Sequence, residues 1–181
     1  MRTFSPSFRL WHWLTAFSMF GIIITVILRK SVMHKEQIGG IVQAKLAELG
    51  TLITDEQAVM IGKAVRNPMW DWHIYFGIAI AVLLVWRFVM IIKNGFGFDE
   101  DPKMQNVYRL YKGVYLLLTI ISMSGLALYY KLAGNSKELV EGMHEYVGYG
   151  IFAFVVVHLI GVILAERGEM KGLISRMIGS R

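Results

Sequence analysis

The stretch Met143–Ala165, MHEYVGYGIFAFVVVHLIGVILA, decides the fold of this chain. It is long and apolar enough to cross a bilayer as one α-helix, yet it contains His144 and His158. The two histidines are 14 residues apart. This spacing is close to four helical turns, so both imidazoles lie on one face, about 21 Å apart along the axis. The helix therefore offers one ligand near each membrane surface.

The composition of the 181-residue chain is that of a membrane protein of one domain, because hydrophobic residues make up 55% of it. The absence of cysteine excludes disulfides, thiolate metal sites and iron–sulfur clusters, which leaves histidine as the strongest metal ligand. The net charge of +6 does not indicate nucleic acid. The basic residues flank apolar segments, where they anchor helix ends and set topology.

Four apolar segments predict an all-α membrane protein, an up-down bundle of four transmembrane helices that forms a single domain over residues 1–181. Asn67 and Pro68 are predicted to begin the second helix as its N-cap and first residue. Asn135 and Glu138 have capping-box spacing ahead of the fourth. The predicted spans are residues 8–28, 72–92, 107–130 and 143–165.

The distribution of lysine and arginine predicts that both termini are cytoplasmic. Four spans put the termini on the same side of the membrane. That side, with the second connection, carries eleven Lys and Arg residues, against eight on the other. Six of the eight fall in the longer first connection, where the positive-inside rule is weaker.

The first connection, residues 29–71, is the one sizeable extramembrane segment. Ile38, Ile41 and Leu46 have helical spacing, and Thr54 with Gln57 forms a predicted capping box before a second amphipathic stretch. We expect two short amphipathic helices over the outer mouth of the bundle. They could dock a partner or only cap a cofactor edge. The second connection, residues 95–102, is short and turn-like.

Depth in the membrane pairs the histidines. His12 and His158 lie within about 6 and 10 Å of the cytoplasmic ends of their spans, by helical rise. His73 and His144 both lie just inside the outer starts of theirs. An up-down bundle would therefore bring His12 to His158 and His73 to His144. His34, in the polar connection, has no partner at its depth and is expected on the surface.

Two facing pairs of neutral imidazoles predict two haem b groups. Polar side chains inside a bilayer are costly and mostly functional, and a b-type haem takes two axial histidines while its macrocycle is apolar. Small residues one turn along each ligand face would leave room for a porphyrin, although such residues also serve close helix packing. They are Ala16, Gly77, Gly148 and Gly161. A single histidine in a membrane span is often an interhelical hydrogen-bonding residue, but four at matched depths are better explained by a ligand.

Two arginines are candidates for haem propionates. Arg9 lies three residues before His12, on nearly the same helical face. Arg87 lies 14 residues after His73, which places it on that face at the cytoplasmic level. Interfacial snorkelling explains both positions equally well.

With these residues in place, the chain resembles the bacterial cytochrome b561 family and, more broadly, the di-haem membrane subunits of formate dehydrogenases and nickel–iron hydrogenases. The resemblance covers nearly the whole chain. It depends on the segment Arg9-Leu-Trp-His12-Trp, on His73, on a third span without histidine, and on His144 and His158.

The resemblance implies that the four histidines are axial ligands of two b haems in the bacterial inner membrane, and that the protein passes electrons between quinone and a donor or acceptor on the periplasmic side. The partners expected are membrane lipid, quinone and a periplasmic redox subunit, and the sequence is compatible with a homo-oligomer. A first connection longer than that of compact stand-alone members leaves open whether the chain is a quinone oxidoreductase or an anchor subunit.

Two readings from other classes compete with the haem protein. A histidine-lined metal-ion transporter would need acidic residues or further ligands along one path, and the spans contain almost no carboxylates. A structural membrane anchor without cofactor would tolerate the loss of His158.

Overall fold

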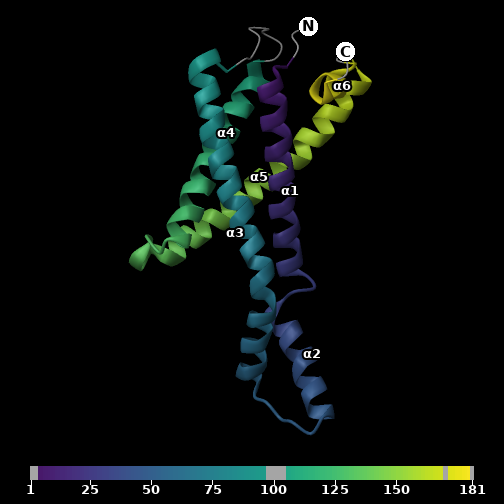
Figure 1. Ribbon diagram of the computed structural model, residues 1–181, viewed down its shortest axis with the longest axis vertical. Coiled ribbons are helices and arrows are strands. Elements are labelled where there is room, and N and C mark those ends of the chain that lie inside the picture. The colour runs from purple at the N-terminus through teal and green to yellow at the C-terminus, as the bar shows by residue number, and fades with distance from the viewer. Residues whose placement is uncertain (1–3, 97–104, 169–170, 180–181) are drawn as a thin grey trace. The chain divides into compact units, whose positions relative to one another are not determined.

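The computed structural model describes residues 4–96, 105–168 and 171–179, and these residues form helices and no strand. The all-α prediction is confirmed. Four of the helices are long and apolar enough to cross a membrane (Figure 1). The turn expected at residues 95–102 lies almost entirely outside the described residues.

Each predicted span lies within one helix, apart from Tyr130 at the end of the third, and the helices continue beyond the other span ends. In chain order they are α1 (Pro6–Lys30), α2 (Lys35–Glu48), α3 (Asp55–Asn94), α4 (Gln105–Tyr129), the 3-10 turn η2 (Gly134–Ser136), α5 (Lys137–Arg167) and α6 (Leu173–Ile178).

The predicted start of the second span at Asn67 and Pro68 is wrong, because α3 runs unbroken through both residues from Asp55. The capping box predicted at Thr54 is confirmed and starts this helix: the Thr54 backbone N–H donates to Gln57 Oε1 at 2.9 Å, and the Gln57 N–H donates to Thr54 Oγ1 at 3.2 Å. A proline inside a helix removes one backbone hydrogen bond and crowds the carbonyl four residues earlier, at a cost of about 3 kcal/mol, and α3 continues through Pro68 in spite of it. The second amphipathic helix is therefore the first part of α3.

The capping box predicted at Asn135 and Glu138 is not formed. The N-cap of α5 is Ser136, and its side chain makes no capping hydrogen bond. The 3-10 turn η2 precedes the helix, and Gly134 has a positive φ of 49°. Asn135 is thus inside a tight turn, where its side chain cannot act as an N-cap.

The chain divides into two compact units. Unit 1 holds residues 1–16 and 78–181, and unit 2 holds residues 17–77. Unit 1 therefore contains the start of α1, the second part of α3 and all of α4, α5 and α6. Unit 2 contains the rest of α1, α2 and the first part of α3.

In unit 1, an aromatic and aliphatic core fixes the start of α1 against α3. Trp11, Leu83 and Met90 are buried together. The indole N–H of Trp11 donates to the Leu83 backbone carbonyl at 2.8 Å, which satisfies the one polar atom of this buried ring. Because Trp11 precedes His12 in the chain, this contact also sets the position of His12.

In unit 2, α2 packs against the first part of α3 at glycine contacts. A Cβ added at Gly39 would lie 2.6 Å from the backbone oxygen of Ala58, and one added at Gly62 would overlap the backbone oxygen of Lys35. The two helices approach this closely only because neither glycine has a side chain.

Replacement of Gly39 by alanine should therefore open this helix pair. We expect Gly39→Ala to cost about 1–3 kcal/mol of local stability, because its methyl group meets backbone atoms that cannot rotate away. Limited proteolysis of residues 31–54 measures the opening. Gly40→Ala is the matched control: no described atom lies within 4 Å of a Cβ there, and alanine should stabilise α2 by up to about 1 kcal/mol. Equal cleavage of the two variants would contradict the packing role of Gly39.

Candidate functional site

Unit 1 brings His12 of α1 and His158 of α5 together. Their ring centroids are 6.2 Å apart, and the ring planes are inclined by 60°. Two imidazoles that bind one metal ion from opposite sides, with metal–nitrogen bonds of about 2.0 Å, have centroids roughly 6 Å apart. The spacing of this pair fits a bis-histidine iron.

Aromatic rings surround the His12–His158 pair. Phe8 stacks near His12, and Phe154 stacks on His158 at 5.6 Å between centroids. Tyr111 of α4 meets His158 edge-on at 6.2 Å. Among the residues that the structure describes, none is hydrogen-bonded to a ring nitrogen of His12 or His158. The pair therefore lies in an apolar, aromatic environment of the kind that suits a haem macrocycle.

His144, also in unit 1, is held by a hydroxyl group of α4. Ser124 Oγ lies 3.0 Å from His144 Nδ1, and the same oxygen donates its hydrogen to the Ile121 carbonyl at 3.1 Å. A Cβ added at Gly125 would lie 3.0 Å from His144 Cε1, so the glycine leaves room for the ring. Ser124 is buried, with 4% of its surface exposed.

His73, in unit 2, is held in the same way by α1. Thr25 Oγ1 lies 3.0 Å from His73 Nδ1 and donates its own hydrogen to the Ile22 carbonyl at 2.7 Å. The Trp70 indole stacks on the imidazole with centroids 4.4 Å apart and planes 4° from parallel. The Arg29 guanidinium lies over the Trp70 ring, 4.4 Å from its centroid. Because His73 and His144 belong to different units, their pairing stays a prediction.

The small residues that were predicted to make room for a porphyrin lie next to open space at two of the histidines. In unit 1, a Cβ at Gly161 would meet no described atom within 4 Å, whereas one at Gly148 would touch Ile121 at 3.6 Å. In unit 2, a Cβ at Gly77 would meet no described atom of its own unit within that distance. This open space and the spacing of His12 and His158 together fit a haem.

Arg87 is buried in unit 1, with 4% of its surface exposed. Its Nε donates to the Tyr115 hydroxyl at 2.9 Å and its Nη2 to the Phe96 carbonyl at 3.0 Å. The guanidinium carbon lies 4.9 Å from the Phe8 ring centroid and 5.4 Å from that of Trp11. These contacts join α1, α3 and α4 around the cation, and they exclude simple snorkelling to solvent as its role.

Arg9 is only partly buried, and its guanidinium lies against the last turn of α6. A Cβ added at Gly179 would lie 2.6 Å from Arg9 Nη1. Nearby, the Trp13 indole N–H donates to the Met177 carbonyl at 3.1 Å. The start of α1 is thus docked on α6, and a role for Arg9 toward a propionate stays a prediction.

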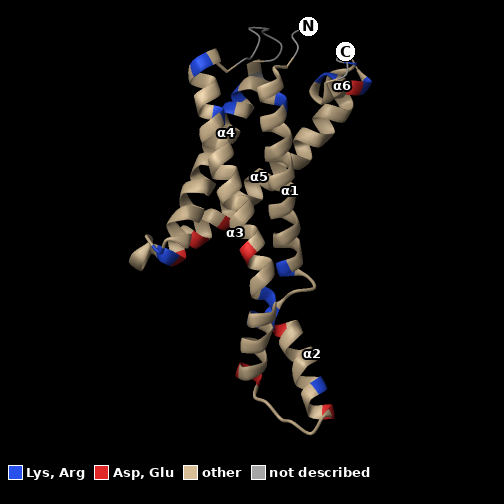
Figure 2. Cartoon of the chain, viewed as in Figure 1, with Lys and Arg blue, Asp and Glu red and all other residues tan. Residues whose placement is uncertain are grey.

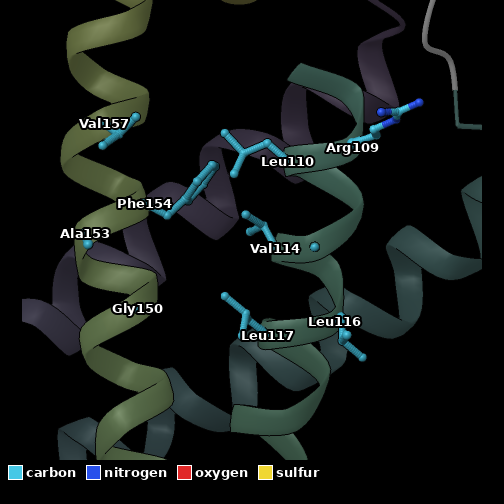
Figure 3. Close-up of a pocket in the computed structure, with 10 residues that line it drawn as sticks. Arg109, Leu110, Val114, Leu116, Leu117, Gly150, Ala153, Phe154 and Val157 are labelled. Atoms are coloured by element: carbon cyan, nitrogen blue, oxygen red, sulfur yellow. The ribbon is translucent and has the colours of Figure 1, made fainter. Parts of the chain in front are cut away.

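A cavity of about 610 Å³ opens between α4 and α5 in unit 1. Leu110, Val114 and Leu117 of α4 point toward Phe154 of α5 across it (Figure 3). Among the described lining residues Arg109 is the charged one, and its guanidinium points away from Phe154 (Figure 3). Phe154, which also stacks on His158, connects the cavity to the histidine pair.

Within the described residues, no group of three or more His, Cys, Asp or Glu side chains converges as a metal site. Zinc and similar ions need three or four protein ligands, whereas a haem iron needs only two because its macrocycle supplies the rest. The paired His12 and His158, in an apolar protein with membrane-spanning helices, fit a membrane cytochrome of the b type. The chain belongs to the prokaryotic cytochrome b561 family, whose family model matches residues 3–180.

Neither the curated proteins nor the solved structures compared with the chain contain a match. Membership in the family makes the protein a bacterial membrane cytochrome that binds haem b and acts in electron transfer.

The contacts of Thr25, Ser124 and Trp70 with the histidines were not predicted from the sequence. Hydroxyl residues in apolar helices commonly bond to their own backbone, so a Thr or Ser in a span is not by itself a sign of a site. The one available signal was the depth of Thr25 and Ser124, which matches that of the outer histidines.

Proposed function

We propose that the protein holds two haem b groups, an inner one on His12 and His158 and an outer one on His73 and His144, and transfers electrons between the quinone pool and a periplasmic redox partner or a small oxidant or reductant. The observation that carries this proposal is the spacing of 6.2 Å between the His12 and His158 rings. A bound b-type haem supplies one-electron redox chemistry at its iron.

The chain's own contribution is ligation, orientation and exclusion of water. His12 and His158 come from the first and last membrane helices, so binding at this site ties the two ends of the fold together. Phe8, Tyr111 and Phe154 shield the pair from polar groups. A low-dielectric, water-poor site of this kind controls reduction potential and solvent access.

The cavity between α4 and α5 is our candidate for the quinone site. Its volume of about 610 Å³ is in the range of small-molecule pockets. Its apolar lining suits a lipophilic ring. Phe154 lies between this cavity and His158, which keeps the proposed electron path short.

The charge distribution in unit 1 supports a cytoplasmic location for both termini, in the inner membrane. Lys and Arg residues are found where α3 ends, where α4 begins and in the first turns of α1, as the colouring of Figure 2 shows. Basic residues next to short loops favour the cytoplasmic side.

The proposal is tested on detergent-purified protein by a reduced-minus-oxidised visible spectrum and a haemochrome assay, followed by reduction with a ubiquinol or menaquinol analogue. We expect two low-spin b haems per chain, reduced by quinol. In the variant Gly113→Leu, which fills the cavity from a position with open space, quinol should reduce the haems more slowly at unchanged haem content. Freshly prepared, folded protein without haem would contradict the cytochrome, and quinol reduction at the original rate in Gly113→Leu would contradict this quinone site.

A further inference from the structure

Each outer histidine contacts a helix-bound hydroxyl group through Nδ1, and this arrangement occurs independently in the two units. In unit 2 the oxygen is that of Thr25 on α1, and in unit 1 it is that of Ser124 on α4. Both distances are 3.0 Å, and both hydroxyls are buried. The inner pair, His12 and His158, has aromatic neighbours in place of such a contact among the residues described.

The direction of these hydrogen bonds follows from the single hydrogen of a hydroxyl group. Thr25 donates its hydrogen to the Ile22 carbonyl at 2.7 Å, and Ser124 donates its hydrogen to the Ile121 carbonyl at 3.1 Å. Each oxygen can then only accept from the imidazole. With each hydroxyl hydrogen on its backbone carbonyl, Nδ1 of each ring carries the proton, and the ring lone pair is on Nε2.

We propose that Thr25 and Ser124 are positioning residues that fix His73 and His144 as Nδ1–H tautomers, present Nε2 to the iron of the outer haem, and set its reduction potential below the value that the same ligands would give without them. This inference depends on the proposed function for the outer site. A hydrogen bond from the second ring nitrogen makes an imidazole a stronger donor and fixes its orientation. A stronger donor stabilises the ferric state more than the ferrous state.

The Trp70 ring supports the same role on the His73 side. It lies parallel to the imidazole, with centroids 4.4 Å apart, so the imidazole plane is fixed by a flat surface as well as by the Thr25 oxygen. On the His144 side, Gly125 leaves the room that the ring needs beside Ser124. Each outer imidazole is thus constrained at Nδ1 and also by its immediate surroundings.

The test is a redox titration of Thr25→Val and Ser124→Ala, with electron paramagnetic resonance of the ferric protein. Valine keeps the shape of threonine but removes the acceptor. We expect the ratio of ferric to ferrous affinity at the outer haem to fall by about tenfold, a rise of ~59 mV for a one-electron couple. The g values of the outer haem, which depend on the ligand planes, should shift as well.

Conservative variants and a matched control separate this role from a loss of folding. Thr25→Ser and Ser124→Thr keep the hydroxyl and should restore both signals. Thr119→Val removes a hydroxyl whose one bond within the described part of the chain is to its own helix, 2.8 Å from the Tyr115 carbonyl, and should leave the reduction potential of the outer haem unchanged. In a His12→Ala background the outer haem is titrated alone. If that background does not fold, the titration is made with both haems present and fitted with two components, one for each haem.

The outcomes distinguish this inference from the proposed function. If wild-type protein contains no outer haem, the proposed function fails and the inference with it. If both haems are present but Thr25→Val and Ser124→Ala leave the potential and g values of the outer haem unchanged, the inference alone is overturned. Loss of haem in Thr25→Val that Thr25→Ser does not restore would also overturn it, because the hydroxyl would then not be the group that matters.

Discussion

Replacement of His158 by alanine is expected to remove the inner haem and leave the outer one. His158 lies 6.2 Å from His12 between ring centroids, and loss of either ring leaves the iron with one protein ligand. Since haem iron in this class of site depends on both axial histidines, the affinity should fall by far more than the 10–100-fold of a disturbed supporting contact. The haemochrome assay should give about one haem per chain, and the amplitude of the reduced-minus-oxidised spectrum should be about half that of wild type.

The control for this experiment is His34→Ala. His34 is exposed, and its Nδ1 lies 2.9 Å from Glu36 Oε2 at the start of α2. An exposed ion pair of this kind contributes little, so this variant should keep both haems. Two intact haems in His158→Ala would refute the assignment of His158 as an axial ligand.

The membrane helices could be predicted from the sequence because a bilayer imposes length and apolarity directly on each segment. The ends of these helices were predicted less accurately. Pro68 indicated a helix start, but it lies inside α3, since the capping box at Thr54 had already begun the helix. Asn135 had the right spacing for a cap and lies in a 3-10 turn instead. Caps depend on local backbone geometry that spacing alone does not determine.

The candidate site could be predicted in part for a similar reason. Helical rise gives the depth of a residue, and depth matched His12 to His158. It gives no information on which side chains contact a ring. The hydroxyl groups of Thr25 and Ser124 lie 48 and 20 residues from their histidines, so only the packing of helices reveals the contacts. Arg87 shows the same limit: its helical face was predicted, but its aromatic surroundings were not.

Replacement of Arg87 by methionine is expected to destabilise the end of unit 1 at which α1 begins and, through it, the proposed inner haem. The guanidinium is 4% exposed and bonds to Tyr115 on α4 and to the Phe96 carbonyl. Hydrogen bonds to charged groups contribute about 1.5–3 kcal/mol, and a desolvated cation over an aromatic ring about 2 kcal/mol. The rings that lose their cation are Tyr115 on α4 and Phe8 and Trp11, which both precede His12 on α1.

We therefore expect Arg87→Met to release the inner haem at a lower temperature than wild type does. The measurement is the loss of the difference spectrum as the protein is heated. Tyr115→Phe is the matched comparison, since it removes one hydrogen bond and keeps the charge and the ring. It should cause a smaller shift in the same direction. If Arg87→Met released the inner haem without any loss of protein thermal stability while Tyr115→Phe had no effect, a direct contact of Arg87 with a propionate would explain the result better than this packing role.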